Sequence, residues 1–352
     1  MADFVGGEFW SDPGHRSDSA IIPSQGMSYL NGGEAAIRLI CDYLNTHAVR
    51  QILVPSYLCS TIADALERYG SAYTFYNIQD NFRIDLEHLQ RMAPGFKALY
   101  IINYFGYGFT SEEVRVFEQL KSQGMMVIED DAQGGFNRGS VANVRFNSLR
   151  KMVPYDGSYF YSDRDMSENL VKFIGLPNHR LAVIREYRQT FARLLAEGAE
   201  DFDVLNPLFD QSEHHYYADL TVLGDPDEQR AAANLDWAAI EATRKANHQR
   251  LYDQLVDLPG IEIIFPKVSA DGPPLGFPIY VNHGKRDALL DYLRERQIYP
   301  IVHWDVLNDF RINKNPQTVA MSGKIITLLL DQRFGLEDMD YEASVTRTFF
   351  ER

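Results

Sequence analysis

Hydrophobic residues change their spacing repeatedly between Asn31 and Met126. Ile37, Ile40, Cys41 and Leu44 recur at helical spacing and predict a helix that begins near Gly32. Asn31 and Glu34, three residues apart, resemble a capping box at its start. Short apolar runs and helical patterns then alternate, and they predict a strand at 52–54, a helix at 60–69, a strand at 73–76, a helix at 86–92, a strand at 98–103, a helix at 111–123 and a strand at 125–128.

This alternation predicts an α/β fold in which helices cover both faces of a mostly parallel sheet. Ligands bind such sheets at the carboxyl ends of the strands. We therefore expect the functional site in the loops that follow Val54, Asn103 and Ile128.

The pattern changes after about Asp203. A polar stretch with His and Tyr at 210–217 precedes a long amphipathic segment at 235–258, which Pro259 and Gly260 end. The remaining pattern predicts a compact α+β unit, with strands at 261–265 and 277–281, a helix at 285–296 and a strand at 299–302. We expect a large domain at 1–240 that includes an N-terminal arm, and a small C-terminal domain at 241–352.

Composition narrows the class of protein. The 352 residues include 34 Lys+Arg and 49 Asp+Glu, a net charge of −15, so nucleic acids and anionic membrane surfaces are not expected partners. Two cysteines, Cys41 and Cys59, are too few for a disulfide framework. The start of the chain lacks the pattern of a signal peptide, and no apolar run approaches the ~20 residues of a membrane span. These features predict a cytoplasmic protein.

Three consecutive acids, Glu129, Asp130 and Asp131, follow the predicted strand at 125–128. An arbitrary acid run is most often a solvated turn or a helix cap, whereas acids at a strand end are also typical of a functional site. A metal site is not expected, because the nine histidines show no ligand spacing and the adjacent pair His214 and His215 is poorly placed for one ion.

Lys151 lies between apolar neighbours about twenty residues later. Desolvation would lower the pKa of its amine and favour covalent chemistry with an aldehyde. Most such lysines instead extend to the surface, so this residue alone decides little.

Together these segments resemble the pyridoxal-phosphate sugar aminotransferases of the DegT/DnrJ/EryC1/StrS family, which have the fold-type I, aspartate aminotransferase-like fold. The resemblance covers roughly residues 20 to 340. It rests on the segments 31–37, 54–57, 104–106, 128–133 and 148–151.

The resemblance implies pyridoxal 5'-phosphate as cofactor and roles for three residues in catalysis and ring binding. Lys151 would bind the cofactor aldehyde and then carry the proton as acid and base. Asp130 would pair with the pyridinium nitrogen, and Gln133 would hydrogen-bond the ring oxygen.

Four further residues would complete the cofactor site. Gly33 and Glu34 would offer backbone N–H groups to the cofactor phosphate at a helix start, and Ser148 would add its hydroxyl. Tyr57 is the expected stacking aromatic, although the family commonly has its aromatic two positions later, where this chain has Cys59.

Other features differ from the family or extend beyond it. The stretch from Asp130 to Lys151 is short, and the asparagine-tyrosine-arginine segment that reaches the neighbouring subunit's phosphate has no clear match, with Asn234 a weak substitute. Arg333 and His303 are expected on the substrate side. A local basic pocket of Arg145, Arg150 and Arg333 would hold an anionic substrate.

The resemblance implies a homodimer that transfers an amino group from an amino acid, glutamate by resemblance, to a keto sugar that is nucleotide-linked. Such a reaction serves amino-sugar formation for surface polysaccharides or secondary metabolites. One alternative is a PLP-dependent sugar dehydratase, in which histidine typically replaces the lysine. The other is a non-catalytic binding protein with the same fold.

Overall fold

The described residues form two sheets, and the larger has seven strands. The computed structural model describes residues 4–10, 27–135, 137–199 and 201–351. The strands lie in the order β1-β7-β6-β5-β4-β2-β3, and their bounds are β1 (Met27–Leu30), β2 (Gln51–Pro55), β3 (Ala72–Tyr76), β4 (Ala98–Ile102), β5 (Met126–Asp130), β6 (Val144–Phe146) and β7 (Ser158–Ser162). The neighbouring strands β3, β2, β4, β5 and β6 are all parallel to one another. Strand β7 is antiparallel to both of its neighbours, β6 and β1. The expected mostly parallel sheet is confirmed.

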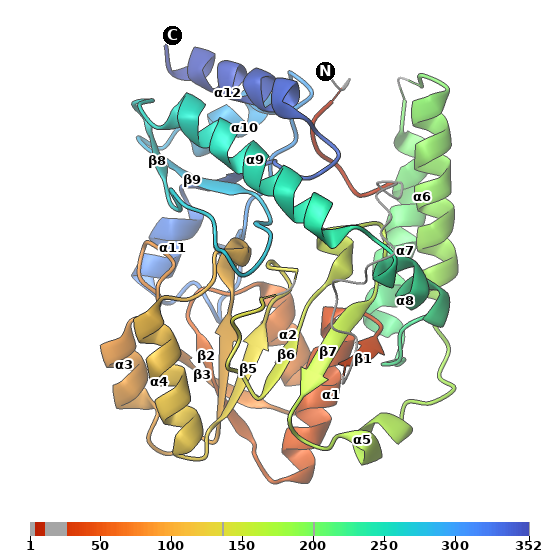
Figure 1. The fold of residues 1–352 in the computed structure, drawn as a ribbon, viewed down its shortest axis with the longest axis vertical. Helices are drawn as coiled ribbons and strands as arrows, with labels where there is room; N and C mark the ends of the chain where they lie inside the picture. The colour runs from red at the N-terminus through yellow and green to blue at the C-terminus, as the bar shows by residue number, and fades with distance from the viewer. Residues whose placement is uncertain (1–3, 11–26, 136, 200, 352) are drawn as a thin grey trace.

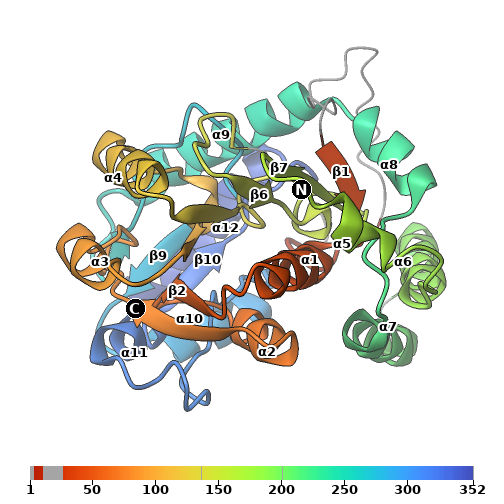
Figure 2. The ribbon, with the colours of Figure 1, turned by 90° about the horizontal axis from the view of Figure 1, so that it is seen from below.

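The central strands are apolar because they are covered on both faces. Every residue of β4 and β5 is buried, as is typical of parallel strands between layers of helices. Helices α1 (Gly33–Thr46) and α2 (Ser60–Arg68) lie on one face of this sheet and α4 (Ser111–Ser122) lies on the other (Figure 2). A Thr110–Glu113 capping box begins α4.

The start of α1 differs from the expected cap. Gly32, with φ of 92°, is the N-cap, and no side chain caps the helix. The predicted capping box of Asn31 and Glu34 is therefore wrong. The predicted start near Gly32 is confirmed, as is α3 (Leu86–Met92) at its predicted bounds.

A smaller antiparallel sheet lies above the first in Figure 1, in the order β10-β9-β8. Its elements are β8 (Ile261–Ile263), β9 (Phe277–Val281), β10 (Ile325–Leu328), α9 (Trp237–Leu255), α10 (Arg286–Arg294), α11 (Pro316–Ser322) and α12 (Leu336–Phe350). The predicted strand at 299–302 is wrong, because only an isolated bridge from Ile301 to Thr327 forms there. Residue 240 lies within α9, and Val5 joins the hydrophobic core around this sheet.

A pair of helices stands beside the large sheet, at the right of Figure 1. It consists of α6 (Arg180–Ala196) and α7 (Asn206–Ala218), with the short helices α5 (Ser167–Val171) and α8 (Pro226–Ala233) nearby. The polar stretch at 210–217 therefore lies within α7. Short 3₁₀ turns at Tyr104–Gly106, Leu149–Lys151 and Asp203–Leu205 complete the fold.

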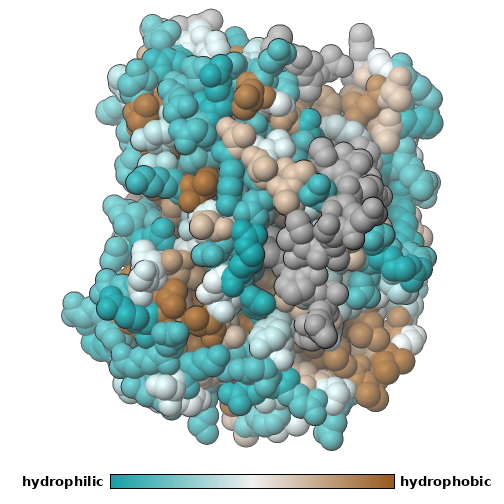
Figure 3. Space-filling model, in the orientation of Figure 1, coloured by the Kyte–Doolittle hydropathy of each residue, from teal (hydrophilic) through white to brown (hydrophobic). Residues whose placement is uncertain are grey.

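Hydrophilic residues predominate on the face shown in Figure 3, in keeping with the net charge of −15. Among the described residues, none of the helices has the length and apolar character that a membrane crossing requires.

Candidate active site

A cavity of about 290 Å³ lies at the carboxyl ends of the central strands. The start of α1, the loop after β5 and the 3₁₀ turn at Leu149–Lys151 form one side, and residues 301–304 close it from the smaller sheet. All the predicted cofactor residues except Tyr57 line it, namely Gly33, Glu34, Asp130, Gln133, Ser148 and Lys151. The fold thus brings together segments that are more than a hundred residues apart.

The three consecutive acids are buried rather than solvated. Glu129, Asp130 and Asp131 are 1%, 5% and 3% exposed. Because side chains alternate along a strand, only Asp130 lines this cavity. Asn137 donates to both neighbours of Asp130. Its side-chain amide donates to Glu129 at 2.6 Å, and its backbone N–H donates to Asp131 at 2.6 Å. The interpretation as a solvated turn is therefore wrong.

Asp130 is held rigidly at the cavity wall. Its carboxylate accepts the Tyr100 hydroxyl at 2.6 Å and the Ala132 N–H at 2.9 Å. Burial raises the pKa of Asp130, and these two donors and the Lys151 amine oppose that rise. A cation placed in the cavity would further favour the ionised form.

Gln133 presents an unused donor. Its Oε1 accepts the Phe105 N–H at 3.0 Å, which fixes the amide orientation. Its Nε2 is buried and has no hydrogen-bond partner among the described residues. A buried donor without a partner is costly, and an acceptor bound in the cavity would satisfy it.

The surroundings of Lys151 shift the pKa of its amine downward. Burial lowers its pKa, the Arg150 charge lowers it further, and Cys59 and Asp130 oppose both effects. His303 lines the same cavity, and burial, with a contribution from Lys151, lowers its pKa to about 3. The imidazole is therefore neutral at physiological pH, and its Nδ1 lies 2.9 Å from Thr327 Oγ1.

The start of α1 suits an anion. A Cβ at Gly33 would lie 3.9 Å from the Ser148 Cβ, so the two residues are side by side. Glu34 Oε1 accepts hydrogen bonds from Arg68 and Tyr69 at 2.7 Å each, while its buried Oε2 has no hydrogen-bond partner among the described residues. The Glu34 N–H points to the Tyr216 hydroxyl at 3.4 Å.

Tyr57 does not reach the cavity. It is 0% exposed, and its ring packs against Phe82 with centroids 5.1 Å apart. Its hydroxyl donates to the His303 carbonyl at 2.7 Å and accepts the Trp304 N–H at 3.0 Å. Tyr57 therefore anchors the loop that closes the cavity, and the structure does not support it as the stacking aromatic. Cys59 and Trp304 do line the cavity.

The wall formed by α7 has no counterpart in the sequence-based prediction. Tyr216 and Tyr217 line the cavity, and a partly buried ionic network fixes their helix. Glu213 accepts from Arg150 at 2.8 Å and from Arg180 at 2.9 Å. Apart from an adjacent pair of aromatics among histidines, no sequence motif marks this wall.

The network continues into the core through Asp156. This carboxylate, 3% exposed, accepts from Arg180 at 2.5 Å and from Arg188 at 2.7 Å. Burial raises its pKa, but the two guanidinium groups outweigh that effect and hold the pKa well below its usual range. Asp156 is thus a fixed anion that joins α6 to the loop after Lys151.

Arg333 lies in an adjoining cavity of about 200 Å³, which Lys151 and His303 also line. Its guanidinium forms two bonds of 2.8 Å with Asp331 and donates to the carbonyls of Glu8 and Gly7 at 2.9 and 3.0 Å. The Arg333 N–H groups that a substrate would need therefore already donate to acceptors of the protein. The structure therefore gives Arg333 an anchoring contact to the N-terminal segment.

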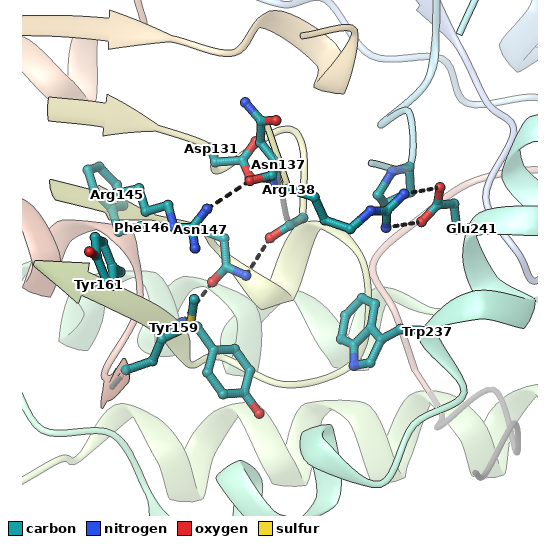
Figure 4. Close-up of a pocket in the computed structure, with 13 residues that line it drawn as sticks. Asp131, Asn137, Arg138, Arg145, Phe146, Asn147, Tyr159, Tyr161, Trp237 and Glu241 are labelled. Carbon is teal, nitrogen blue, oxygen red and sulfur yellow. Dashed lines mark hydrogen bonds and ion pairs between the residues drawn. The ribbon is translucent and has the colours of Figure 1, made fainter. Parts of the chain in front are cut away.

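A third cavity, of about 190 Å³, flanks the other side of the strand ends (Figure 4). Arg145 lies there, where it donates to the Asn137 carbonyl at 2.9 Å, and Arg138 and Glu241 pair at its rim. The predicted basic pocket of all three arginines is therefore wrong. Arg150 and Arg333 both line the second cavity, whereas Arg145 lies at the third.

Comparison with known proteins identifies the fold. No protein-family model and no curated protein sequence matches the chain. Solved structures do match, and they include sugar aminotransferases and a DegT/DnrJ/EryC1/StrS aminotransferase. A DegT DnrJ EryC1 StrS aminotransferase from Brucella abortus has a TM-score of 0.61 at 16% identity, over 93% of this chain and 86% of that one.

Two further matches carry information on ligands of those proteins. Spr1654 from Streptococcus pneumoniae in its PLP-form gives a TM-score of 0.64 at 16% identity, over 92% of this chain and 87% of that one. DesI in the presence of its TDP-sugar product gives 0.64 at 14% identity, over 93% and 81%. The chain therefore has the fold of these aminotransferases, as predicted.

Proposed function

We propose that this protein is a pyridoxal-phosphate-dependent aminotransferase. It moves an amino group from an amino acid, glutamate, to a keto sugar carried by a nucleotide, and acts as a cytoplasmic homodimer in amino-sugar biosynthesis. The observation that carries the proposal is the meeting of Lys151, Asp130 and Gln133 on one cavity wall. The shared fold supports it.

The residues present fit the cofactor. Gln133 Nε2 is a buried donor in need of an acceptor, which a ring oxygen would supply. Asp130 would hold the ring nitrogen, while Gly33, Glu34 and Ser148 would hold the phosphate at the helix start. When bound, pyridoxal phosphate supplies an aldehyde carbon that accepts the amino group and a ring that withdraws electrons.

The chain's own groups supply the proton transfer. Because burial lowers its pKa, the Lys151 amine can accept a proton from the substrate carbon and return it. The neutral His303 adds no charge beside it. Arg150, held by Glu213, keeps a positive charge at the cavity, which also lowers the pKa of Lys151.

The amino-donor half-reaction tests the proposal without knowledge of the sugar. Purified protein loaded with pyridoxal phosphate is mixed with glutamate, and formation of 2-oxoglutarate and of the amine form of the cofactor is followed. We expect conversion by the parent and by Lys172→Ala, an exposed control, and none by Lys151→Ala. Equal conversion by Lys151→Ala would refute the proposal.

The acceptor half separates transamination from dehydration. Protein in the amine form is offered nucleotide-linked keto sugars, and products are analysed by mass spectrometry. An amino sugar is expected. A deoxy keto sugar without net amino transfer would favour the dehydratase, and failure to bind the cofactor at all would favour the non-catalytic binding protein.

A further inference from the structure

Three side chains of types that can bind metal ions lie close together where the C-terminal end of α7 meets the N-terminal end of α6. His179, His215 and Asp219 each offer one ligand atom, and these atoms all lie within 4.8 Å of one another. His179 Nδ1 is 2.7 Å from Asp219 Oδ1, and the two imidazole centroids are 5.5 Å apart. The cluster could not be recognised from the sequence, because His179 lies far along the chain from the adjacent pair His214 and His215.

The fold holds the carboxylate of the cluster in place. Asp219 is the C-cap of α7 and is 8% exposed. Its Oδ2 accepts the backbone N–H groups of His179 and Arg180 at 2.8 and 3.0 Å, which fixes the carboxylate at the start of α6. Its Oδ1 is left to face the imidazole. The His179 side chain is 59% exposed, so solvent and ions can reach the cluster.

Two imidazoles and one carboxylate form a donor set that suits zinc and similar divalent ions. Bonds of about 2.0–2.2 Å to a tetrahedral ion place pairs of ligand atoms about 3.4 Å apart. Small rotations of the exposed His179 and the half-buried His215 would bring the cluster to that spacing. We propose that His179, His215 and Asp219 bind one divalent transition-metal ion of the zinc type, with solvent in the fourth position.

The position of the site gives the ion a structural role. His215 and Asp219 flank Tyr216 and Tyr217, which line the candidate active-site cavity. The Asp219 carbonyl also accepts from Arg38 of α1 at 3.0 Å. A bound ion therefore joins the ends of α6 and α7 and fixes the wall of the cavity. The metal site itself does not depend on the proposed aminotransferase activity.

Equilibrium binding of Zn²⁺ tests the site on the full-length protein, freed of any affinity tag and stripped with chelator. Competition with a metal indicator should show one equivalent bound by the parent. His179→Ala and His215→Ala should each weaken binding at least tenfold. His214→Ala, which removes the exposed neighbour of His215, should bind as the parent does.

Two further readouts guard against a variant that fails to fold. Circular dichroism without metal should be unchanged in the His179→Ala variant, since that side chain is largely exposed, and Zn²⁺ should raise the melting temperature of the parent but not of the variant. The proposal is overturned if the parent binds no stoichiometric Zn²⁺, or if the variant lacking both His179 and His215 binds it equally well.

Discussion

The two walls of the candidate active-site cavity are built in different ways. The first wall is the strand-end wall, formed by the start of α1 and by residues 130–133 and 148–151, all of which follow strands or begin a helix. The second is the α7 wall, formed by Tyr216 and Tyr217 and held by ion pairs of Glu213. The first wall carries the groups for chemistry, and the second carries groups that shape and close the cavity.

This difference indicates how the walls should respond to substitution. A change in the strand-end wall should alter turnover with little effect on folding, because its side chains face the cavity. A change in the α7 wall should alter folding or cofactor affinity, because its charges are paired and are partly or fully buried.

Of the changes that compare the two walls, the largest effect on turnover is expected at Asp130. Asp130→Asn keeps hydrogen-bonding capacity toward Tyr100 and Ala132 but loses the negative charge beside the ring nitrogen. We expect turnover of the donor half-reaction to fall on the order of 10²–10³-fold, with little change in the unfolding midpoint. Asp131→Asn is the matched control, since Asp131 does not line this cavity. Equal losses in both variants would show that the acid run acts only through stability.

Asp156 tests the buried network of the α7 wall. Asp156→Asn leaves Arg180 and Arg188 without their shared anion, and breaking such a buried pair costs about 3–5 kcal/mol of unfolding free energy. Urea unfolding measures this loss. Arg193→Ala on the exposed face of α6 should change stability by less than about 1 kcal/mol. A loss of activity at unchanged stability in Asp156→Asn would contradict the division between the two walls.

Tyr216 lies where the walls meet. Tyr216→Phe removes a hydroxyl that accepts the Glu34 N–H and would donate its own hydrogen to a bound phosphate. We expect cofactor affinity to weaken about threefold to tenfold, as for one lost hydrogen bond. Titration of the apoprotein with pyridoxal phosphate measures it. Tyr217→Phe serves as control on the same helix, and an unchanged affinity in Tyr216→Phe would remove that hydroxyl from the phosphate end.

Glu342 provides a pH test outside both walls. Burial raises its pKa to about 8, so folded Glu342 keeps its proton between about pH 4.5 and 8 while the unfolded chain loses it. The folded state then binds more protons, and its stability falls as the pH rises through this window. Glu342→Gln should reduce that fall when unfolding is compared at pH 5 and pH 8. The exposed Glu118→Gln should not, and an unchanged slope in Glu342→Gln would contradict the protonated state.

The strand-end wall could be predicted from the sequence, because the patterns that mark it lie within short segments of the chain. Apolar runs marked the strands that end at Asp130 and Pro55. A resemblance in residues 128–133 and 148–151 assigned Gln133 and Lys151 to one site, and the two residues line one cavity. Tyr57 was misplaced because its burial depends on Phe82 and on the loop at His303, which are distant in sequence.

The α7 wall could not be predicted because long-range charge pairs define it. Glu213 meets Arg150 and Arg180 only after α6 and α7 pack together. The same holds for Arg333, whose acceptors belong partly to residues 7 and 8 at the other end of the chain. Pattern and spacing carry no information on such pairs.

Borohydride reduction of the protein loaded with pyridoxal phosphate tests the central claim most directly. Visible absorption is recorded before and after reduction, and the modified peptide is located by mass spectrometry. We predict a reducible band and a label on Lys151. No band, or a label on another lysine with Lys151 unmodified, would contradict the assignment of this cavity as the active site.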